Sequence, residues 1–202
     1  MSKPITDPKL WTPRSVEETM SLYQNWADTY DAKLAQLSYM TPARLAAALA
    51  GHLPADTAIL DFGCGTGLSG AALKTAGFQT FDGTDITPEM LAKAEDRGIY
   101  RKLWQGKPGT VDVPAETYGA IFAAGVISLG AAPAELLAVL LNFLPKDGLL
   151  AFSYNDPTLQ DQTYLDALDA VLVADAELLV REYGPHLTGK DMSSDVIILR
   201  KR

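Results

Sequence analysis

The feature that most constrains this chain is a run of three glycines at alternate positions, between a short apolar segment and a helical pattern. The apolar segment, residues 58–62, has the character of a parallel strand that is buried on both faces. Without a Cβ atom, the glycines let the backbone turn sharply and let a ligand approach it closely; they are Gly63, Gly65 and Gly67. Residues 68–76 continue as a helix that ends before Gly77, with its free N–H groups facing whatever the turn binds.

The spacing of these glycines distinguishes between nucleotide-binding motifs. A dinucleotide-binding turn has the pattern G-x-G-x-x-G, whereas Leu68 occupies the place of its third glycine here. A P-loop needs Gly-Lys-Ser or Gly-Lys-Thr, and this segment has neither. The motif therefore favours a nucleotide-like ligand of another kind, and the alternative is a glycine-rich turn that binds nothing.

A second motif follows at the end of the next expected strand, residues 78–86. Asp85 closes this strand 18 residues after Gly67, and Thr87-Pro88 then begin a helix as its cap and first residue. A carboxylate in that place can accept hydrogen bonds from both vicinal hydroxyls of a ribose. The alternative is an acidic residue that only interacts favourably with the dipole of the following helix.

Together, the two motifs resemble those of class I S-adenosylmethionine-dependent methyltransferases. The second motif of that family is matched at Gly83, Asp85, Thr87, Met90, Leu91 and Ala94. The overall pattern is most similar to the small methyltransferase-like proteins of the Williams–Beuren region type. The resemblance implies S-adenosyl-L-methionine as the cofactor, with its methionine part at the glycine loop and its adenine between Ile86 and Met90.

The rest of the chain alternates strands with helices, which implies right-handed crossovers and a parallel sheet. Further strands are expected at 98–105, 118–125, 149–154, 178–183 and 196–200, and further helices at 133–144 and 158–174. We expect a Rossmann-like α/β fold with a seven-stranded, mostly parallel sheet, helices on both faces and an antiparallel last strand, as in class I methyltransferases. A single domain is expected, with a tail and helical lid over residues 1–52 and the cofactor domain over residues 53–202.

The N-terminal segment is expected to form the lid. Residues 1–14 are interpreted as an extended tail because they contain Pro4, Pro8 and Pro13. A helix begins after Ser15, which forms a capping box with Glu18, and a second helix runs from the cap Thr41-Pro42 to near Gly51.

Aromatic side chains gather between these two helices. The stretch around Trp26 and Tyr30 resembles the Trp-Ala-x-x-Tyr-Asp segment that precedes the cofactor domain of many small methyltransferases and folds over the cofactor. Tyr30 is therefore expected to contact the cofactor. The alternative is that the aromatic residues form the core of a helical hairpin; they are Tyr23, Trp26, Tyr30 and Tyr39.

The resemblance also implies which residues bind the cofactor. They are expected to be Tyr30, Asp61, Gly63, Cys64, Gly65, Gly67, Leu68, Asp85, Ile86, Met90, Gln105, Gly106 and Gly125. One position departs from the family, because Lys107 stands near the place where many relatives bind the adenine amino group with an Asp. Gln105 or the backbone of Gly106 is expected to substitute, with Trp104 either stacking on the adenine or packing in the core.

Candidates for the catalytic chemistry are few. In relatives, the loop after the fourth strand lies beside the reactive methyl group, which points to Gly125, Val126 and Ser128. This loop lacks the Asn/Asp-Pro-Pro-Tyr/Phe motif of enzymes that methylate amino groups of adenine or glutamine, so that substrate class is disfavoured. Candidate general bases are Tyr154, Asp156 and His186, the last in a loop expected between the two final strands. A base is required only if the acceptor loses a proton.

Two further chemistries are disfavoured. Cys64 is interpreted as a small residue of the glycine loop rather than as a thiol nucleophile. The chain has 2 histidines, so a multi-histidine metal site is not expected.

Composition limits the partners and the compartment. The net charge is -8, and nine acidic residues against two basic ones between Asp156 and Asp195 would repel nucleic acid. The single cysteine indicates a reducing compartment, and residues 1–7 lack the apolar core of a signal peptide. The longest rich apolar run, residues 136–144, is too short to cross a membrane. A cytoplasmic protein without a membrane or nucleic-acid partner is expected.

The resulting hypothesis is methyl transfer by in-line displacement from S-adenosylmethionine to a small-molecule acceptor. An alternative from another class is a non-catalytic module that binds S-adenosylmethionine or S-adenosylhomocysteine. A nucleotide-dependent oxidoreductase is a third hypothesis, and Leu68 in place of the third glycine weakens it.

Overall fold

The structure is a computed structural model that describes Thr12 and residues 14–202. The tail expected over residues 1–14, with its three prolines, lies almost entirely outside the described residues. The same holds for residues 1–7, where no signal peptide is expected. The capping box predicted for the first helix is confirmed, because the Ser15 hydroxyl accepts from Glu18 N–H while the Glu18 carboxylate accepts from Ser15 N–H.

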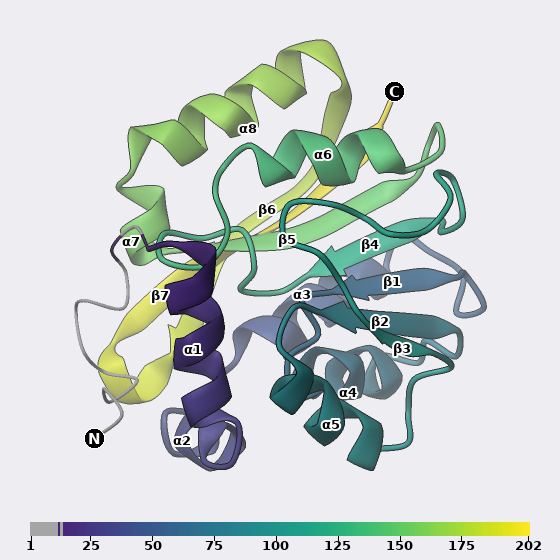
Figure 1. Cartoon of the computed structure of the whole chain (residues 1–202). Coiled ribbons are helices and arrows are strands. Elements are labelled where there is room, and N and C mark those ends of the chain that lie inside the picture. Colours follow the sequence, from purple (N-terminus) through teal and green to yellow (C-terminus); the bar gives the residue numbers. More distant parts are fainter. Residues whose placement is uncertain (1–11, 13) are drawn as a thin grey trace.

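A seven-stranded sheet with the order β3-β2-β1-β4-β5-β7-β6 forms the centre of the molecule (Figure 1). Strands β1 to β5 pair in parallel, and β7 runs antiparallel to both β5 and β6. The strands are β1 (Ile59–Phe62), β2 (Phe81–Asp85), β3 (Leu103–Gln105), β4 (Ala120–Ala123), β5 (Leu149–Asn155), β6 (Ala176–Leu187) and β7 (Met192–Lys201). The predicted Rossmann-like architecture, including the antiparallel last strand, is confirmed.

Helices cover both faces of this sheet. Figure 1 shows α3, α4 and α5 on one face, α6 and α8 on the other, and α1 and α2 beside the carboxyl ends of the parallel strands. The helices are α1 (Val16–Trp26), α2 (Tyr30–Gln36), α3 (Thr41–Ala50), α4 (Leu68–Thr75), α5 (Pro88–Asp96), α6 (Leu136–Phe143), α7 (Asp156–Leu159) and α8 (Gln162–Ala174), with a 3₁₀ turn at Thr188–Lys190.

The alternation of side chains along each strand divides the core into two layers. In β5, Leu150 and Phe152 pack with the leucines of α6, whereas Leu149 and Ala151 pack with Leu45 of α3. Because successive side chains of a strand point to opposite faces, a continuous apolar strand fills both layers at once. This explains why the central strands lack the alternating polar residues of a half-exposed sheet.

The N-terminal helices differ from the expectation in two respects. An additional helix, α2, forms between the two that were predicted. Helix α3 was assigned to the lid, but Leu45 and Leu49 are fully buried in the layer that covers the sheet. Thr41 is not the cap of α3; its hydroxyl instead lies 2.8 Å from His186 Nδ1, while Met40 takes the cap position. The segment expected to form the lid is therefore reduced to α1 and α2.

The C-terminal half shows further corrections. Helix α6 begins at Leu136 rather than at Pro133, and the helix expected over residues 158–174 divides into α7 and α8. The break lies at Asp161, whose side chain accepts from Thr163 N–H as the N-cap of α8, whereas Asn155 caps the start of α7 by accepting from Thr158 N–H. Strand β6 extends to Leu187, so His186 lies within a strand and not in the expected loop.

Two other structural features concern the described residues as a whole. No helix within residues 14–202 is long and apolar enough to span a membrane. In the same part of the chain, no group of three His, Cys, Asp or Glu side chains is arranged to hold a metal ion.

Replacing Leu140 of α6 by alanine is expected to lower the free energy of unfolding by roughly 2–5 kcal/mol, because this fully buried side chain fills the layer between α6 and the sheet. Val139 is its neighbour on the same helix and is 41% exposed, so Val139→Ala is expected to change the free energy by less than about 0.5 kcal/mol. Urea denaturation followed by circular dichroism measures both variants. Equal losses would contradict the assigned faces of α6.

Candidate functional site

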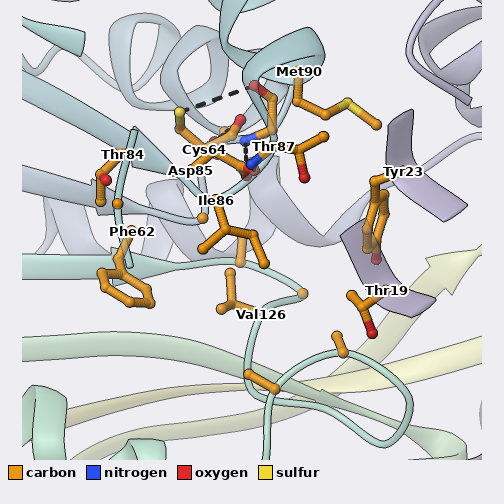
Figure 2. Close-up of a pocket in the computed structure, with 18 of the residues that line it drawn as sticks. Thr19, Tyr23, Phe62, Cys64, Thr84, Asp85, Ile86, Thr87, Met90 and Val126 are labelled. Atoms are coloured by element: carbon orange, nitrogen blue, oxygen red, sulfur yellow. Dashed lines mark hydrogen bonds between the residues drawn. The ribbon is translucent and has the colours of Figure 1, made fainter. Parts of the chain in front are cut away.

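A cavity of about 370 Å³ opens at the carboxyl ends of β1, β2 and β4, under α1 and α2. Parallel α/β sheets bind ligands at this edge, and the volume suits a small molecule. Most of the residues predicted to bind the cofactor line the cavity; they are Tyr30, Gly63, Cys64, Gly65, Leu68, Asp85, Ile86, Met90, Gly106 and Gly125. Figure 2 shows Phe62 and Thr84 toward one end, Thr19 and Tyr23 toward the other, and Ile86 between them.

Three of the predicted binding residues do not line this cavity. Asp61 is fully buried beneath the glycine loop, and Gly67 is the residue that precedes α4. Gln105 is exposed, and its amide donates to the Ile86 carbonyl at 3.1 Å, so it supports the loop after β2. Trp104 packs against the core, which agrees with the core alternative.

The glycine loop is held against the end of β2 by backbone hydrogen bonds. Gly63 N–H and Cys64 N–H both donate to the Thr84 carbonyl, at 2.8 and 3.0 Å. Gly63 has a φ of 70°, and a Cβ atom added to it would lie 2.5 Å from a Val126 methyl group. Gly65 has a φ of 54°, and nothing lies within 4 Å of the position of its missing Cβ. The backbone of Gly65 is therefore open to a ligand.

Asp85 joins the two loops that form the floor of the cavity. One oxygen of its carboxylate accepts from Gly65 N–H at 2.9 Å, and the other accepts from Thr87 N–H at 2.8 Å. Burial raises the pKa of Asp85, although these backbone hydrogen bonds oppose the rise. Each carboxylate oxygen can accept more than one hydrogen bond. Asp85 can thus hold the loops and still accept from the hydroxyls of a ligand in the cavity.

Asp61 supports the glycine loop from below. Its Oδ2 accepts from the Ser69 hydroxyl and from the Tyr100 hydroxyl, both at 2.6 Å, and its Oδ1 has no partner. Tyr100 reaches this position because Gly70 has no side chain; a Cβ there would lie 2.3 Å from the Tyr100 hydroxyl. Burial raises the pKa of Asp61 to about 7, partly opposed by these hydrogen bonds.

Three buried hydroxyl groups in the wall of the cavity were missed by the sequence analysis. Thr19, Thr84 and Thr87 each have a hydroxyl without a hydrogen-bond partner, and each lines the cavity. Because a buried polar group without a partner costs free energy, these hydroxyls are suited to bind a ligand. Thr84 lies one residue before Asp85 and Thr87 two residues after it, so the second sequence motif could have pointed to these two hydroxyls.

Helix α2, which belongs to the expected lid, is held on the glycine loop by a set of polar contacts that we call the latch. The Asp31 carboxylate of α2 accepts from the Thr66 hydroxyl and pairs with Arg97. Arg97 also donates through Nε to the Thr66 carbonyl at 2.6 Å. Above this latch, the rings of Tyr23, Trp26 and Tyr30 pack with centroids 5.9 to 6.4 Å apart. The aromatic residues therefore pack together as the core alternative expected, and Tyr23 and Tyr30 also line the cavity.

The three candidate general bases lie outside this cavity. Tyr154 is fully buried in the core, where its hydroxyl donates to the Tyr164 carbonyl at 3.4 Å. Asp156 accepts from the Tyr183 hydroxyl and from Ser193 N–H, and it holds the end of β7. His186 is buried in β6, and burial lowers the pKa of its imidazole to about 4. Burial also raises the pKa of the Cys64 thiol, as expected for a structural residue of the loop.

The fold and the site resemble those of class I S-adenosylmethionine-dependent methyltransferase domains. The sheet order with antiparallel β7, the glycine loop after β1 and the carboxylate at the end of β2 are the features that carry this conclusion. The residues fit S-adenosylmethionine, the cofactor of such a domain. Asp85 lines the cavity, the backbone of Gly65 is open, and the unpartnered threonine hydroxyls add polar groups to the wall.

Comparison with known proteins agrees with this class. Residues 59–148 match a family described as a methyltransferase domain. The chain is 31% identical over 160 residues to Methyltransferase-like protein 27 of Homo sapiens. This alignment covers 77% of this chain and 64% of the relative. It is 33% identical over 133 residues to the Malonyl-[acyl-carrier protein] O-methyltransferase of Halalkalibacterium halodurans. This second alignment covers 60% of this chain and 46% of the relative. The chain thus spans less than two thirds of each of these relatives.

A solved structure supports the fold. The TehB-like SAM-dependent methyltransferase of Corynebacterium glutamicum superposes with a TM-score of 0.62 and 22% identity. The similarity covers 87% of this chain and 98% of that protein. It therefore extends beyond the matched family region of residues 59–148.

Asp61→Asn is expected to change how stability depends on pH. The pKa of Asp61 is raised from 3.8 to about 7, so between these values the folded protein holds a proton that the unfolded chain has lost. As the pH rises through this window, the free energy of unfolding of the wild type should fall relative to that of Asp61→Asn. Urea denaturation across a pH series measures the difference. Parallel curves for the two proteins would contradict a raised pKa at Asp61.

Proposed function

We propose that this protein transfers a methyl group from S-adenosylmethionine to a small-molecule acceptor. The observation that carries the proposal is Asp85, whose carboxylate closes β2, binds the glycine loop through Gly65 N–H and still lines the cavity. A carboxylate so placed can accept from the two ribose hydroxyls of the cofactor.

The remaining contacts follow from the shape of the cavity. Ile86 and Met90 offer an apolar surface for the adenine, and the open backbone of Gly65 lies where the methionine part would bind. Thr84 offers an alternative to the missing adenine-binding Asp. Its unpartnered hydroxyl lies 2.6 Å from the position of a Cβ on Gly106, beside the loop where that Asp occurs in the family.

In the proposed reaction, the protein positions the acceptor and excludes water, and it contributes less through acid–base chemistry. When bound, S-adenosylmethionine supplies a methyl group that is already activated by the positive charge on its sulfur. The protein then has to orient the acceptor and keep water out, and the lid formed by α1 and α2 covers the cavity for that purpose. Burial raises the pKa of Tyr23 and of Tyr30, so both stay protonated at neutral pH and act as hydrogen-bond donors.

Two features support a small-molecule acceptor. The cavity lies under a latched lid, where a small molecule fits more readily than a folded macromolecule. The net charge of -8 disfavours a nucleic-acid acceptor. A cytoplasmic location, expected from the single cysteine, belongs to the same proposal.

Calorimetric titration with S-adenosylhomocysteine and S-adenosylmethionine tests the cofactor site. Asp85→Ala is expected to weaken binding by roughly 10- to 100-fold, because hydrogen bonds to a charged group contribute about 1.5–3 kcal/mol. Asp96→Ala removes an exposed carboxylate at the end of α5 and is the matched control, with unchanged affinity expected.

The outcomes separate the candidate functions. Failure of the folded wild type to bind either compound, or equal affinity of Asp85→Ala, would contradict the cofactor site. Binding at Asp85 without methyl transfer to any member of an acceptor panel would instead favour a non-catalytic module that binds S-adenosylmethionine or S-adenosylhomocysteine.

A further inference from the structure

A second cavity, of about 90 Å³, adjoins the cofactor cavity. The two share part of their walls, namely Tyr23, Tyr30, Tyr39, Gly125 and Ala131. The Tyr39 hydroxyl lies 2.7 Å from the position that a Cβ on Gly125 would occupy, so it stands directly over the loop after β4. The second cavity is therefore entered from the place where that loop meets the lid.

Arg14 gives this cavity a positive charge, and it has no anionic partner among the residues that the structure describes. Its Nη2 donates to the Gly130 carbonyl, whereas its Nε is buried and has no hydrogen-bond partner. Among the described residues that line the cavity, none is acidic. A guanidinium is charged at every relevant pH, and a buried donor without a partner costs free energy. A ligand oxygen with negative charge would satisfy Arg14.

His186 supplies a second donor. Its Nδ1 lies 2.8 Å from the Thr41 hydroxyl, which lies 2.8 Å from the Ser194 hydroxyl. Arg44 can only donate, and it donates to Ser194 Oγ at 3.4 Å. The Ser194 hydroxyl can then donate to the Thr41 hydroxyl oxygen, and the Thr41 hydroxyl can donate to His186 Nδ1. We assign the proton of the neutral ring to Nε2 on this basis.

The neutral state of the ring agrees with its surroundings. Burial lowers the pKa of His186 to about 4, so the imidazole is uncharged at neutral pH and its Nε2–H is a donor. Four aromatic side chains also line the cavity, with Trp26 beside the three shared tyrosines. Burial raises the pKa of Tyr39, which keeps its hydroxyl protonated. The cavity thus offers donors and apolar rings, and no strong base.

We propose that the second cavity binds the methyl acceptor, and that this acceptor is a carboxylic acid whose carboxylate contacts Arg14 Nε–H and His186 Nε2–H while its apolar part packs among the aromatic rings. Arginine matches the planar geometry of a carboxylate. A doubly charged phosphate would meet only one positive side chain in the described wall of the cavity. The role of acceptor rests on the proposed function, whereas binding of a carboxylate here does not.

Benzoate and its neutral analogue benzamide are the probes. Each is titrated calorimetrically into the whole 202-residue chain, with and without saturating S-adenosylhomocysteine. The wild type is expected to bind benzoate about tenfold or more tightly than benzamide, because a hydrogen bond to a charged group is stronger than one between neutral groups. Equal binding of the two probes, or no binding of benzoate, would overturn the proposal without any substitution being needed.

Arg14→Gln is expected to abolish the preference for benzoate and to leave the affinity for S-adenosylhomocysteine unchanged, because Arg14 lines only the second cavity. Arg200→Gln is the matched control, since Arg200 pairs with Glu177 on the exposed face of the sheet edge and should keep the preference. A preference for benzoate that survives in Arg14→Gln would overturn the proposal. If the wild type bound benzoate but not S-adenosylhomocysteine, the proposed function would fail while the carboxylate site would stand.

Discussion

The site depends on one carboxylate that accepts hydrogen bonds from two separate loops. Asp85 receives N–H groups from Gly65 and from Thr87, and the backbone of Thr84 receives two more from the start of the glycine loop. These contacts fix the spacing between the ends of β1 and β2, and this spacing creates the floor of the cavity. Asp61 holds the same loop from below through Ser69 and Tyr100. Two carboxylates thus hold the loops that form the floor of the cavity.

The parts of the molecule that follow from local pattern were predictable. The glycine loop and the cap pair Thr87-Pro88 mark sharp changes of backbone direction, and continuous apolar runs mark strands that are buried on both faces. From these signals and the family resemblance, the sheet and most of the helices were predicted, and ten of the residues predicted to bind the cofactor line the cavity. Asp85 is the clearest case, since its distance along the chain from the glycines places it at the neighbouring strand end.

The parts that depend on distant contacts were not predictable. Thr41 has the sequence of a helix cap, but its hydroxyl binds His186, which is 145 residues away along the chain. His186 lies between Pro185 and a glycine-containing segment, so local pattern indicated a loop, whereas pairing with β7 keeps it in a strand. The burial of Tyr154 follows from its pairing with Asp195 beneath α8, and no local signal distinguishes it from an exposed strand end.

Amide hydrogen exchange with and without saturating S-adenosylhomocysteine tests the central claim most directly, namely that the loop held by Asp85 contacts the cofactor. Slower exchange is predicted over residues 63–68 and in the α1–α2 lid, because both line the cavity. The exposed stretch 177–183 of β6 lies outside the cavity and should exchange as before. Unchanged exchange over residues 63–68 at saturation, or protection only in β6, would contradict the assignment of the cofactor site.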